Sequence, residues 1–561
     1  MKRFTKTALS AVAFGALFGV ACSGPQAPAT APSGGTASQP SGGSGAAPAA
    51  PKTNRVILAV EAPVSESNRV RELGQTAMWQ IAPMYEYLVG MKPEDGTYYP
   101  QLATEWTVKP DGSAMNFKLR KGVQYQNGFG EFTAKDVIFA WQDLIKPDAT
   151  AGYQVTLARE SIENIEAVND YEVNITIKKK NSDLLNMISQ GQGGMEMISK
   201  ANFDKTGDPS LTTAPLAGTG PYQMKSRQQG VNVLYERMPG QHWRITPDFP
   251  EFEFRWLKEP STRLAGLLAV EIHMTSLPND LQPQATSQGF KTAIGKVKAL
   301  RTFVSFWCCF IKNGQYTDTS SPLHNVKVRQ AMNKAVDRAA MNKAFFGGKG
   351  ETTYGVNFLP ETHPSFNPAW KANFEKDYGY DVNAAKALLA EAGYGPNNPV
   401  KTSIFIHPLA QYAGAQDVEE ALAQYWRAVG IDIQLNTMDQ TQMQTASRGC
   451  QLTNHLDVIG TSGAPLGPYG YYNSSFIGNC GGYQNPETDA LYQKLLDEMD
   501  VSKHTPLFRD LGDASYRLYA NIPLFWLPAE VMFNTKVVQD WVWPGSISGT
   551  WTHVENIKAV K

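Results

Sequence analysis

The residues that could do chemistry do not fall into the spacings of a known catalytic motif. The sequence has no GxSxG nucleophile elbow, no P-loop, no GxGxxG and no HExxH. Gly191-Gln-Gly-Gly194 is superficially similar to a phosphate loop but lacks the following Lys and Ser or Thr, so we interpret it as a loop. The eight histidines are scattered singly. We therefore predict a protein that is not an enzyme and that uses no cofactor and no metal ion.

The N-terminus has the pattern of an exported protein. Lys2, Arg3 and Lys6 precede an apolar run over residues 8–21, which is too short to span a bilayer but is typical of a signal peptide. It ends in Gly19-Val-Ala-Cys22, similar to a bacterial lipoprotein processing site, although Gly19 stands where Leu is usual. We predict a signal peptide over 1–21 and a lipid on Cys22 that anchors the protein. Ordinary signal cleavage is the alternative.

A tether follows the predicted lipidation site. Residues 22–53 are almost wholly Gly, Ala, Pro, Ser, Thr and Gln, so they cannot bury apolar surface and are predicted to form a disordered linker. Thirty such residues have a root-mean-square reach of about 30 Å. A domain on this linker would stay close to the membrane but could tumble beside a membrane complex.

Composition excludes several partners for the rest of the chain. The chain has 51 basic and 52 acidic residues, a net charge of −1, and no long basic run, which disfavours nucleic acid and polybasic membrane binding. No second apolar stretch reaches membrane-spanning length, so we expect a soluble mature domain. The roughly 510 residues after the linker exceed one hydrophobic core and predict two or more lobes.

Four cysteines remain after Cys22. In an exported chain an even number suggests disulfides, but sequence does not give their connectivity. Cys450 and Cys480 lie in Gly-flanked, loop-like settings, and we favour that pair. Cys308 and Cys309 lie in an apolar run, where buried free thiols are expected.

Local patterns predict alternating helices and strands. Thr133 with Asp136 forms a variant capping box, Asp381 can cap a helix, and Asn485-Pro486 has the cap and N1 proline of a helix start. Residues 325–346 have the periodicity of one helix, and 418–429 form another that ends at Gly430 before an alternating strand from Ile431. Repeated helix–Gly–strand units predict an α/β lobe with a partly parallel sheet.

Several short motifs occur in a fixed order along the chain. They are Leu102–Trp106, the Pro110-Asp-Gly112 turn, the strand Met115–Leu119, Phe132–Trp141, Gly218–Tyr222, Val326–Ala331, Ala335–Arg338, Val429–Ile433 and Ile522–Leu524. This ordered set resembles the large solute-binding proteins of peptide- and nickel-type ABC importers, extracellular family 5. Each motif alone is weak, but the order is specific.

The resemblance implies a two-lobed α/β fold of the periplasmic-binding-protein type, with an extra subdomain inserted in the first lobe and a hinge between lobes. It assigns 54–97, 206–296 and 523–561 to lobe I, 98–205 to the insert and 297–522 to lobe II. The implied function is a substrate-binding lipoprotein that captures an oligopeptide, oligosaccharide or other small metabolite.

Such a protein would deliver the solute to an ABC permease and ATPase complex, as a monomer on the periplasmic or extracellular face. Two alternatives stay open. One is an exported enzyme acting on glycans or peptides. The other is a ligand-sensing lipoprotein without a transport role.

Aromatic residues are the candidates for contacting the solute. Trp79 and Tyr85 lie in a stretch that lines the cleft in relatives, and Trp526 lies near the second lobe crossing. Trp307 lies in a predicted strand after the first crossing, with a core tryptophan as the alternative. Ser462, Gly463 and Tyr469 belong to a Gly-rich loop whose backbone can approach a ligand closely.

That loop departs from the peptide-binding relatives. In them it supplies an aspartate that pairs with the α-ammonium of the ligand, whereas here no acid occurs between Val458 and Tyr472. Asp457 lies in the preceding strand at a structural position and is a poor substitute. A buried ammonium without a carboxylate would lose a charge-assisted hydrogen bond of ~1.5–3 kcal/mol. We therefore expect a small or neutral solute.

Overall fold

The computed structural model describes residues 51–561 except 64, 192, 212–213, 299, 355–358, 407–414, 439–441, 444, 447–449, 462–481 and 546–550. The predicted signal peptide, Cys22 and nearly all of the linker thus lie outside the described residues. None of the helices in the described part is long and apolar enough to cross a membrane. The described residues belong to one compact unit.

The first sheet has seven strands in the order β12-β21-β11-β1-β10-β9-β8. At its centre, β1 pairs in parallel with β10 and β11, and its residues from Val56 onward are buried, as expected for a parallel strand covered on both faces. The strands are β1 (Arg55–Val60), β8 (Tyr222–Gln228), β9 (Asn232–Arg237), β10 (Glu251–Trp256), β11 (Met274–Thr275), β12 (Lys291–Ile294) and β21 (Glu530–Phe533).

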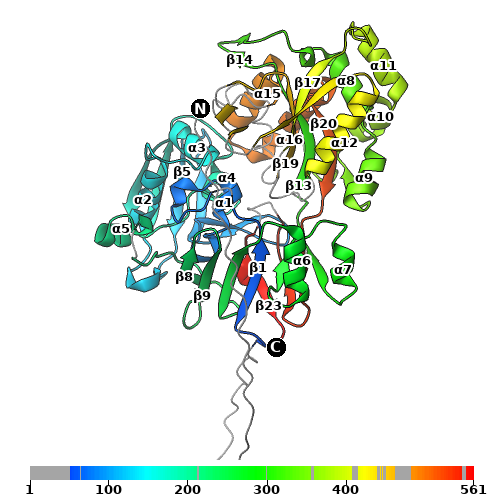
Figure 1. The fold of residues 1–561 in the computed structure, drawn as a ribbon. Coiled ribbons are helices and arrows are strands. Elements are labelled where there is room, and N and C mark those ends of the chain that lie inside the picture. The colour runs from blue at the N-terminus through cyan, green and yellow to red at the C-terminus, as the bar shows by residue number, and fades with distance from the viewer. Residues whose placement is uncertain are drawn as a thin grey trace, which may run out of the picture. The chain divides into compact units, whose positions relative to one another are not determined.

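Two apolar layers cover this sheet. Ile57, Ala59 and Met532 pack with Leu264 and Leu267 of helix α6 (Pro260–Leu268) in a cluster that also contains Ala285 of α7 (Gln282–Thr286). Figure 1 shows α6 and α7 beside β1. Val56, Leu58 and Val60 point into a larger cluster on the opposite face. The period-2 alternation of β1 therefore places its side chains alternately in two hydrophobic clusters, one on each face of the sheet.

A four-stranded antiparallel sheet, β4-β5-β7-β6, lies within the range predicted as the insert. The predicted capping box is confirmed, because Thr133 and Asp136 cap α2 in both directions. Helix α1 (Gln75–Met78) precedes this region. The elements within it are β4 (Ala103–Val108), β5 (Ala114–Leu119), β6 (Ile162–Asn169), β7 (Glu172–Ile177), α2 (Ala134–Leu144), α3 (Tyr153–Ser161), α4 (Leu184–Ile188) and α5 (Lys200–Thr206). A small hairpin-like pair, β2 (Val89–Met91) and β3 (Tyr98–Pro100), precedes it.

The second large sheet has six strands in the order β16-β20-β13-β19-β17-β18. Its central strand β13 is buried along its whole length, and β17 pairs in parallel with both β18 and β19. The predicted partly parallel sheet is therefore present. The strands are β13 (Leu300–Trp307), β16 (Glu351–Thr352), β17 (Lys401–Ile406), β18 (Asp432–Thr437), β19 (His455–Thr461) and β20 (Asn521–Leu527).

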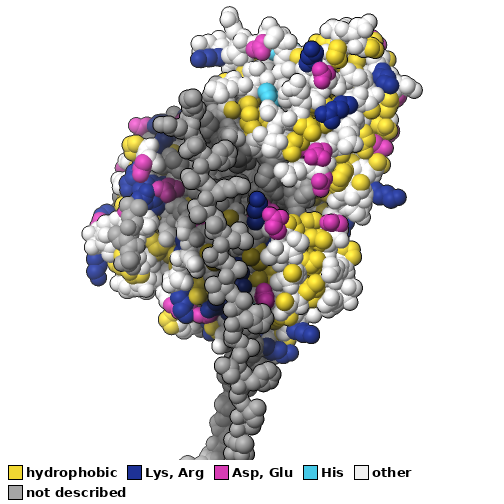
Figure 2. Space-filling view, viewed as in Figure 1, with side chains coloured by type: hydrophobic (Ala, Val, Ile, Leu, Met, Phe, Trp, Pro, Cys, Tyr) yellow, Lys and Arg dark blue, Asp and Glu magenta, His cyan; other side chains and the backbone are white. Residues whose placement is uncertain are grey.

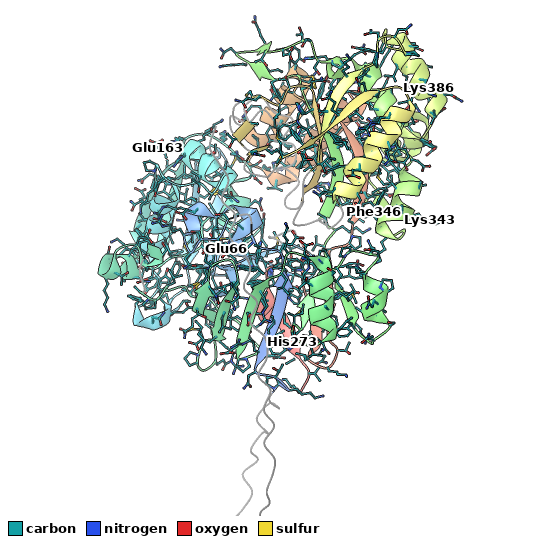
Figure 3. All side chains as sticks on the ribbon, viewed as in Figure 1. Glu66, Glu163, His273, Lys343, Phe346 and Lys386 are labelled. Carbon is teal, nitrogen blue, oxygen red and sulfur yellow. A yellow bond between two sulfur atoms is a disulfide. The ribbon has the colours of Figure 1, made fainter. Side chains whose placement is uncertain are left out.

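The helices of this half begin mostly where the sequence predicts. Asp381 caps α11 and Asn485 caps α15 with Pro486 at its first turn. They are α8 (Val326–Lys334), α9 (Arg338–Phe346), α10 (Pro368–Tyr378), α11 (Val382–Glu391), α12 (Ala415–Ala428), α15 (Pro486–Asp497) and α16 (His504–Arg517). Phe346, labelled in Figure 3, ends α9 and packs against Phe525 of β20 with ring centroids 5.3 Å apart.

The prediction of one helix over residues 325–346 is wrong. Ala335 ends α8, and the side chain of Asp337 accepts a hydrogen bond from the amide of Ala340 to begin α9. The apolar periodicity continues through the break, because Ala335 and Val336 are buried in the same core cluster. A capping aspartate inside a periodic run was the signal for two helices.

The chain passes twice between the two large sheets. The first crossing runs from β12 to β13, and the second runs from β20 to β21. Residues 523–527 were predicted in lobe I, but β20 pairs with β13 from Asn521 to Leu527, so the return comes after Leu527. Short pairs complete the fold: β14 (Ile311–Lys312) with β15 (Gln315–Tyr316), and β22 (Val538–Trp541) with β23 (Ile557–Ala559).

Cys308 and Cys309 form a disulfide with each other, so the prediction of buried free thiols is wrong. Both residues are buried, and Cys309 has a φ of 65°. Adjacent cysteines cannot meet in a regular strand, because alternate side chains point to opposite faces. The pair follows directly after β13, where the strand has ended.

Candidate functional site

The carboxyl ends of the parallel strands in both large sheets lie at the edges where the chain crosses between them. In the second sheet β19 ends at Thr461, which is opposite Arg301 at the start of β13. In the first sheet Val60, the last residue of β1, is opposite Trp256, the last residue of β10. Ligands of α/β sheets bind outside the carboxyl ends of the strands. These two edges are therefore the candidate solute site.

Three aromatic rings line up behind the edge of the first sheet. Trp79 lies edge-on to Phe254 and to Trp256, at centroid distances of 4.9 and 5.5 Å. Trp79 is 4% exposed, so the structure places this predicted solute contact in the core. Its packing fixes the ring of Trp256 at the edge itself.

Trp256 is a candidate that sequence reasoning missed. Its indole Nε1 is buried and has no hydrogen-bond partner among the described residues. A buried indole N–H normally finds an acceptor, so this donor at the strand end marks a place for a polar partner. The signal was the alternation of Phe252, Phe254 and Trp256, which predicts a strand whose last aromatic residue reaches its end.

An acidic group follows β1 at the same edge. Glu61 is partly exposed, and its carboxylate lies 3.8 Å from Nη1 of Arg263. Burial raises the pKa of Glu61, and the charge of Arg263 opposes that shift. Arg263 also donates to the carbonyls of Leu257 and Lys258, which holds its guanidinium against the end of β10.

The edge of the second sheet carries a cation over an aromatic face. Trp526 is opposite Arg301 in the pairing of β20 with β13. The guanidinium of Arg301 lies 5.6 Å from the ring centroid of Trp526, within the range of a cation–π interaction. Both side chains are buried. The structure thus places the predicted residue Trp526 at the candidate site.

Trp307 lies at the opposite end of β13. Six residues separate it from Arg301, which corresponds to about 20 Å along the strand. Its ring packs edge-on to Phe405 at 5.9 Å, in a cluster with Phe310, Met443 and Leu452. The structure does not bring Trp307 and Trp526 together, and the core interpretation of Trp307 fits its surroundings.

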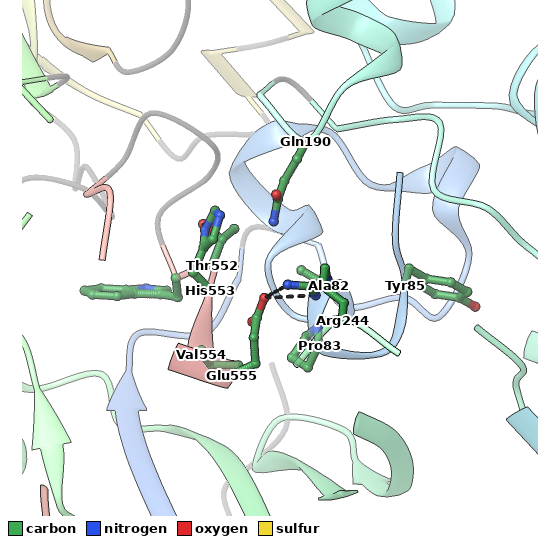
Figure 4. A pocket seen from close by; sticks show the side chains of 10 residues that line it. Ala82, Pro83, Tyr85, Gln190, Arg244, Thr552, His553, Val554 and Glu555 are labelled. Atoms are coloured by element: carbon green, nitrogen blue, oxygen red, sulfur yellow. Dashed lines mark hydrogen bonds and ion pairs between the residues drawn. The ribbon is translucent and has the colours of Figure 1, made fainter. Parts of the chain in front are cut away.

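Tyr85 lines a small pocket next to the C-terminal segment, together with Gln190, Arg244 and residues 551–555. Figure 4 shows the ring of Tyr85 pointing away from Arg244 and Glu555. The cavity volume is about 10 Å³, on the scale on which one water molecule needs roughly 10–15 Å³. This pocket fits a water molecule and is too small for a solute.

The cation in this pocket is paired with two carboxylates of the protein. Nε of Arg244 donates to Glu86 at 2.7 Å, and its Nη1 and Nη2 donate to Glu555 at 3.1 Å. Burial alone would lower the pKa of Arg244, but the charges of Glu555 and Glu86 raise it instead. Nε1 of Trp243 donates to Glu86 as well. The arrangement is a buried ion triad, which suits a structural role.

Asp457 is buried inside β19, four residues before the strand ends at Thr461. That spacing puts it about 13 Å from the edge. Ser462, Gly463, Tyr469 and Cys480 lie outside the described residues. Cys450 is disulfide-bonded, and its pairing with Cys480 stays a prediction. Figure 2 shows basic and acidic side chains interspersed on the visible described surface.

Known proteins are similar to this chain in sequence and in fold. Residues 97–483 match the family described as bacterial extracellular solute-binding proteins, family 5 Middle. The chain is 27% identical over 461 residues to the heme-binding protein A of Haemophilus influenzae, covering 76% of this chain and 78% of that protein. It is 25% identical over 411 residues to the dipeptide-binding protein of Escherichia coli, covering 70% and 73%.

Solved structures extend the likeness to the fold. A dipeptide-binding protein from Pseudoalteromonas sp. SM9913, in complex with Met-Leu, has a TM-score of 0.74 at 20% identity and covers 90% of this chain and 100% of its own. AgaA from A. tumefaciens R10, in complex with agropinic acid, has a TM-score of 0.72 at 19% identity, with coverage of 90% and 99%.

The predicted two-lobed α/β fold is confirmed by these likenesses. With more than half of its length matched, the chain belongs to the family 5 bacterial extracellular solute-binding proteins, which are binding proteins rather than enzymes.

Proposed function

We propose that the protein is the substrate-binding component of an ABC importer and captures one small solute between its two lobes. The observation that carries the proposal is the placement of both sheets' carboxyl edges at the two crossings, in a chain that matches the family over residues 97–483. Hinge closure around a ligand at such edges is a common mode of capture. The lobes have the boundaries predicted above, with the second crossing after Leu527.

The proposal includes a membrane anchor and a transporter complex as partner. A lipid on Cys22 holds the protein on the periplasmic or extracellular face, and the linker over 22–53 lets a monomer reach its permease and ATPase complex. Replacing Cys22 by Ser should release the protein from the membrane fraction, and mass spectrometry of the wild type should find the acyl chains on Cys22. Membrane retention of the Cys22→Ser variant would contradict the anchor without touching solute capture.

The solute class is inferred from the carboxylates near the two edges. Asp457 is buried well behind the edge, and the loop over 462–472 contains no acidic residue. Glu61 at the first edge already has Arg263 within 3.8 Å. An incoming ammonium would therefore lack a dedicated carboxylate, which favours a neutral oligosaccharide, a blocked peptide or another uncharged metabolite over a free peptide.

A panel of matched ligands tests both the function and the solute class. Native mass spectrometry first identifies a co-purified solute. The melting temperature is then measured with free Met-Leu, with its N-acetylated form and with neutral oligosaccharides, because a ligand that binds the folded state raises it. A shift with neutral compounds that changes little with salt supports the proposal. Tight binding of free Met-Leu that is lost on acetylation would contradict the neutral solute.

Two tryptophans at opposite ends of the second sheet locate the site. Trp526→Ala should weaken binding by ~1 kcal/mol or more if its ring contacts the solute, as aromatic anchors do. Trp307→Ala is the matched control, because it lies about 20 Å away along β13 and should lower stability while leaving affinity nearly unchanged. The reverse pattern would move the site to the far end of the second sheet. Trp256→Phe removes the N–H donor together with part of the ring, and it should weaken binding of solutes with acceptor oxygens.

A further inference from the structure

The inserted subdomain contacts the second lobe at a place separate from the two crossings. The amide of Ser182 donates to the carbonyl of Leu496 at 3.0 Å, and the Ser182 hydroxyl donates to the carbonyl of Leu495 at 3.3 Å. Ser182 lies just before α4, whereas Leu495 and Leu496 lie in the last turn of α15. The groups are more than 300 residues apart in the chain.

These bonds satisfy groups that a helix cannot satisfy by itself. The last four carbonyls of an α-helix have no partner within the helix and need a cap, a side chain or water. The residue that ends α15, Glu498, has an extended backbone. Ser182, which belongs to the insert, therefore caps the end of α15. Separating the two lobes would expose the carbonyls of Leu495 and Leu496 to water.

A second contact lies next to the first. Gly112 ends the Pro110-Asp-Gly112 turn with a φ of 69°, and a Cβ at that position would come within 2.5 Å of Cγ of Met499. The side chain of Met499 packs against the large core cluster that contains the first sheet and the insert. Met499 follows α15 by two residues, so the same helix end carries both contacts.

Helix α15 is attached to the second lobe by contacts on both sides of its length. Tyr483, three residues before α15, pairs with Cys308 in a β-bridge and stacks under the guanidinium of Arg329 at 4.1 Å. The side chains of Leu495 and Leu496 pack with Phe508 and Leu511 of α16. Helix α15 must therefore move with the second lobe, while Ser182 and Gly112 move with the insert.

We propose that Ser182, Gly112 and the end of α15 through Met499 form a latch that holds the two lobes together and sets how often they open. The role of the latch, but not its existence, rests on the proposed function. A protein that captures a solute between two lobes depends on the fraction of molecules in the closed state, and the latch would set that fraction. It acts by three removable contacts, which open as one event when the lobes separate.

The test uses the full-length chain without solute, so its outcome is independent of solute identity. The variant carries Ser182→Ala and Met499→Ser, which remove the hydroxyl bond and the methionine packing. Amide hydrogen exchange of the segment containing Ser182 and the radius of gyration from X-ray scattering are compared with the wild type. Val501→Ser is the matched control, because Val501 lies two residues beyond Met499 and is 69% exposed.

Loss of these contacts should speed exchange of the segment containing Ser182 by about 2- to 10-fold and increase the radius of gyration. The control should match the wild type, and Met499→Leu, which keeps the packing, should restore slow exchange. A circular dichroism melt checks that the variant is folded. Unchanged exchange and an unchanged radius in the folded variant would overturn the latch, while a solute-induced melting shift would still support the proposed function.

Discussion

Two largely buried arginines, Arg244 and Arg329, are held in opposite ways. In the first lobe Arg244 lies between the carboxylates of Glu86 and Glu555, and their charges raise its pKa. In the second lobe Arg329 donates to the carbonyls of Leu518 and Leu323, and burial lowers its pKa. Within the described residues Arg329 has no carboxylate in ion-pair contact.

The comparison teaches that a buried cation can be held by charge or by dipoles, with different consequences for its surroundings. Removing Arg244 would leave two buried charges without a partner. Removing Arg329 would leave neutral carbonyls, each of which costs less than a charge. Arg338 follows the second pattern, because it donates to the carbonyls of Pro523 and Tyr378 and burial lowers its pKa to about 10.

The largest effect is expected for Arg244→Met. It strands Glu86 and Glu555 in a buried site and should lower the free energy of unfolding by about 3–5 kcal/mol. Chemical denaturation measures the loss. Adding Glu86→Gln and Glu555→Gln should recover much of it, because the neutral amides need no cation. A triple variant as unstable as the single one would show that packing, and not charge, decides the site.

A smaller loss is expected for Arg329→Met, about 2–3 kcal/mol, because the groups left behind are uncharged. The same denaturation experiment gives the value. Within the described residues no carboxylate pairs with Arg329. No Glu→Gln substitution of the kind used for Arg244 is therefore available to recover the lost stability. A loss larger than that of Arg244→Met would reverse the ranking and show that carbonyl capping matters more than charge pairing here.

A pH-dependent effect is expected at Glu196, a buried carboxyl that has no ion-pair partner among the described residues. It accepts hydrogen bonds from Tyr87 Oη and from the amide of Gly194. Burial raises its pKa from 4.5 to about 7. Because the folded protein then binds the proton more tightly than the unfolded chain, the stabilisation is present below pH 4.5 and is lost as the pH rises through about 7.

Melting curves between pH 4.5 and 8 test this group. The wild type should lose up to about 3 kcal/mol through Glu196 over that range, and Glu196→Gln should lack that part of the slope. Tyr87→Phe is a useful companion, because it removes one donor and should steepen the dependence. Parallel pH profiles for the wild type and Glu196→Gln would mean that the carboxyl titrates normally in the folded state.

Local chemistry explains why part of the fold could be predicted. The caps at Thr133, Asp381 and Asn485 depend on residues within one helical turn, and all three form as expected. The helix over 325–346 was mispredicted because its apolar period continues through Asp337, where the cap overrides the period. The motif around Arg329 marked the family, and the structure gives that residue a structural role.

The candidate site depended on contacts that no local pattern contains. Trp79 was expected to line the cleft, yet it packs on Phe254 and Trp256, which lie far along the chain. The Cys308–Cys309 disulfide occurs with a positive φ at Cys309, which a non-glycine residue adopts only in particular surroundings. Trp526 lies at the edge because the pairing of β20 with β13 places it opposite Arg301. The sequence does not specify that register.

The two ends of the folded domain meet on the side away from the candidate site. The amide of Lys52 donates to the carbonyl of Val560 at 3.1 Å, whereas β1 carries the chain from there to the carboxyl edge at Val60. A sensor surface or a fluorescent fusion partner could therefore be attached through either end without covering the solute edge. The same adjacency makes the domain suited to circular permutation, since a short linker would join its ends.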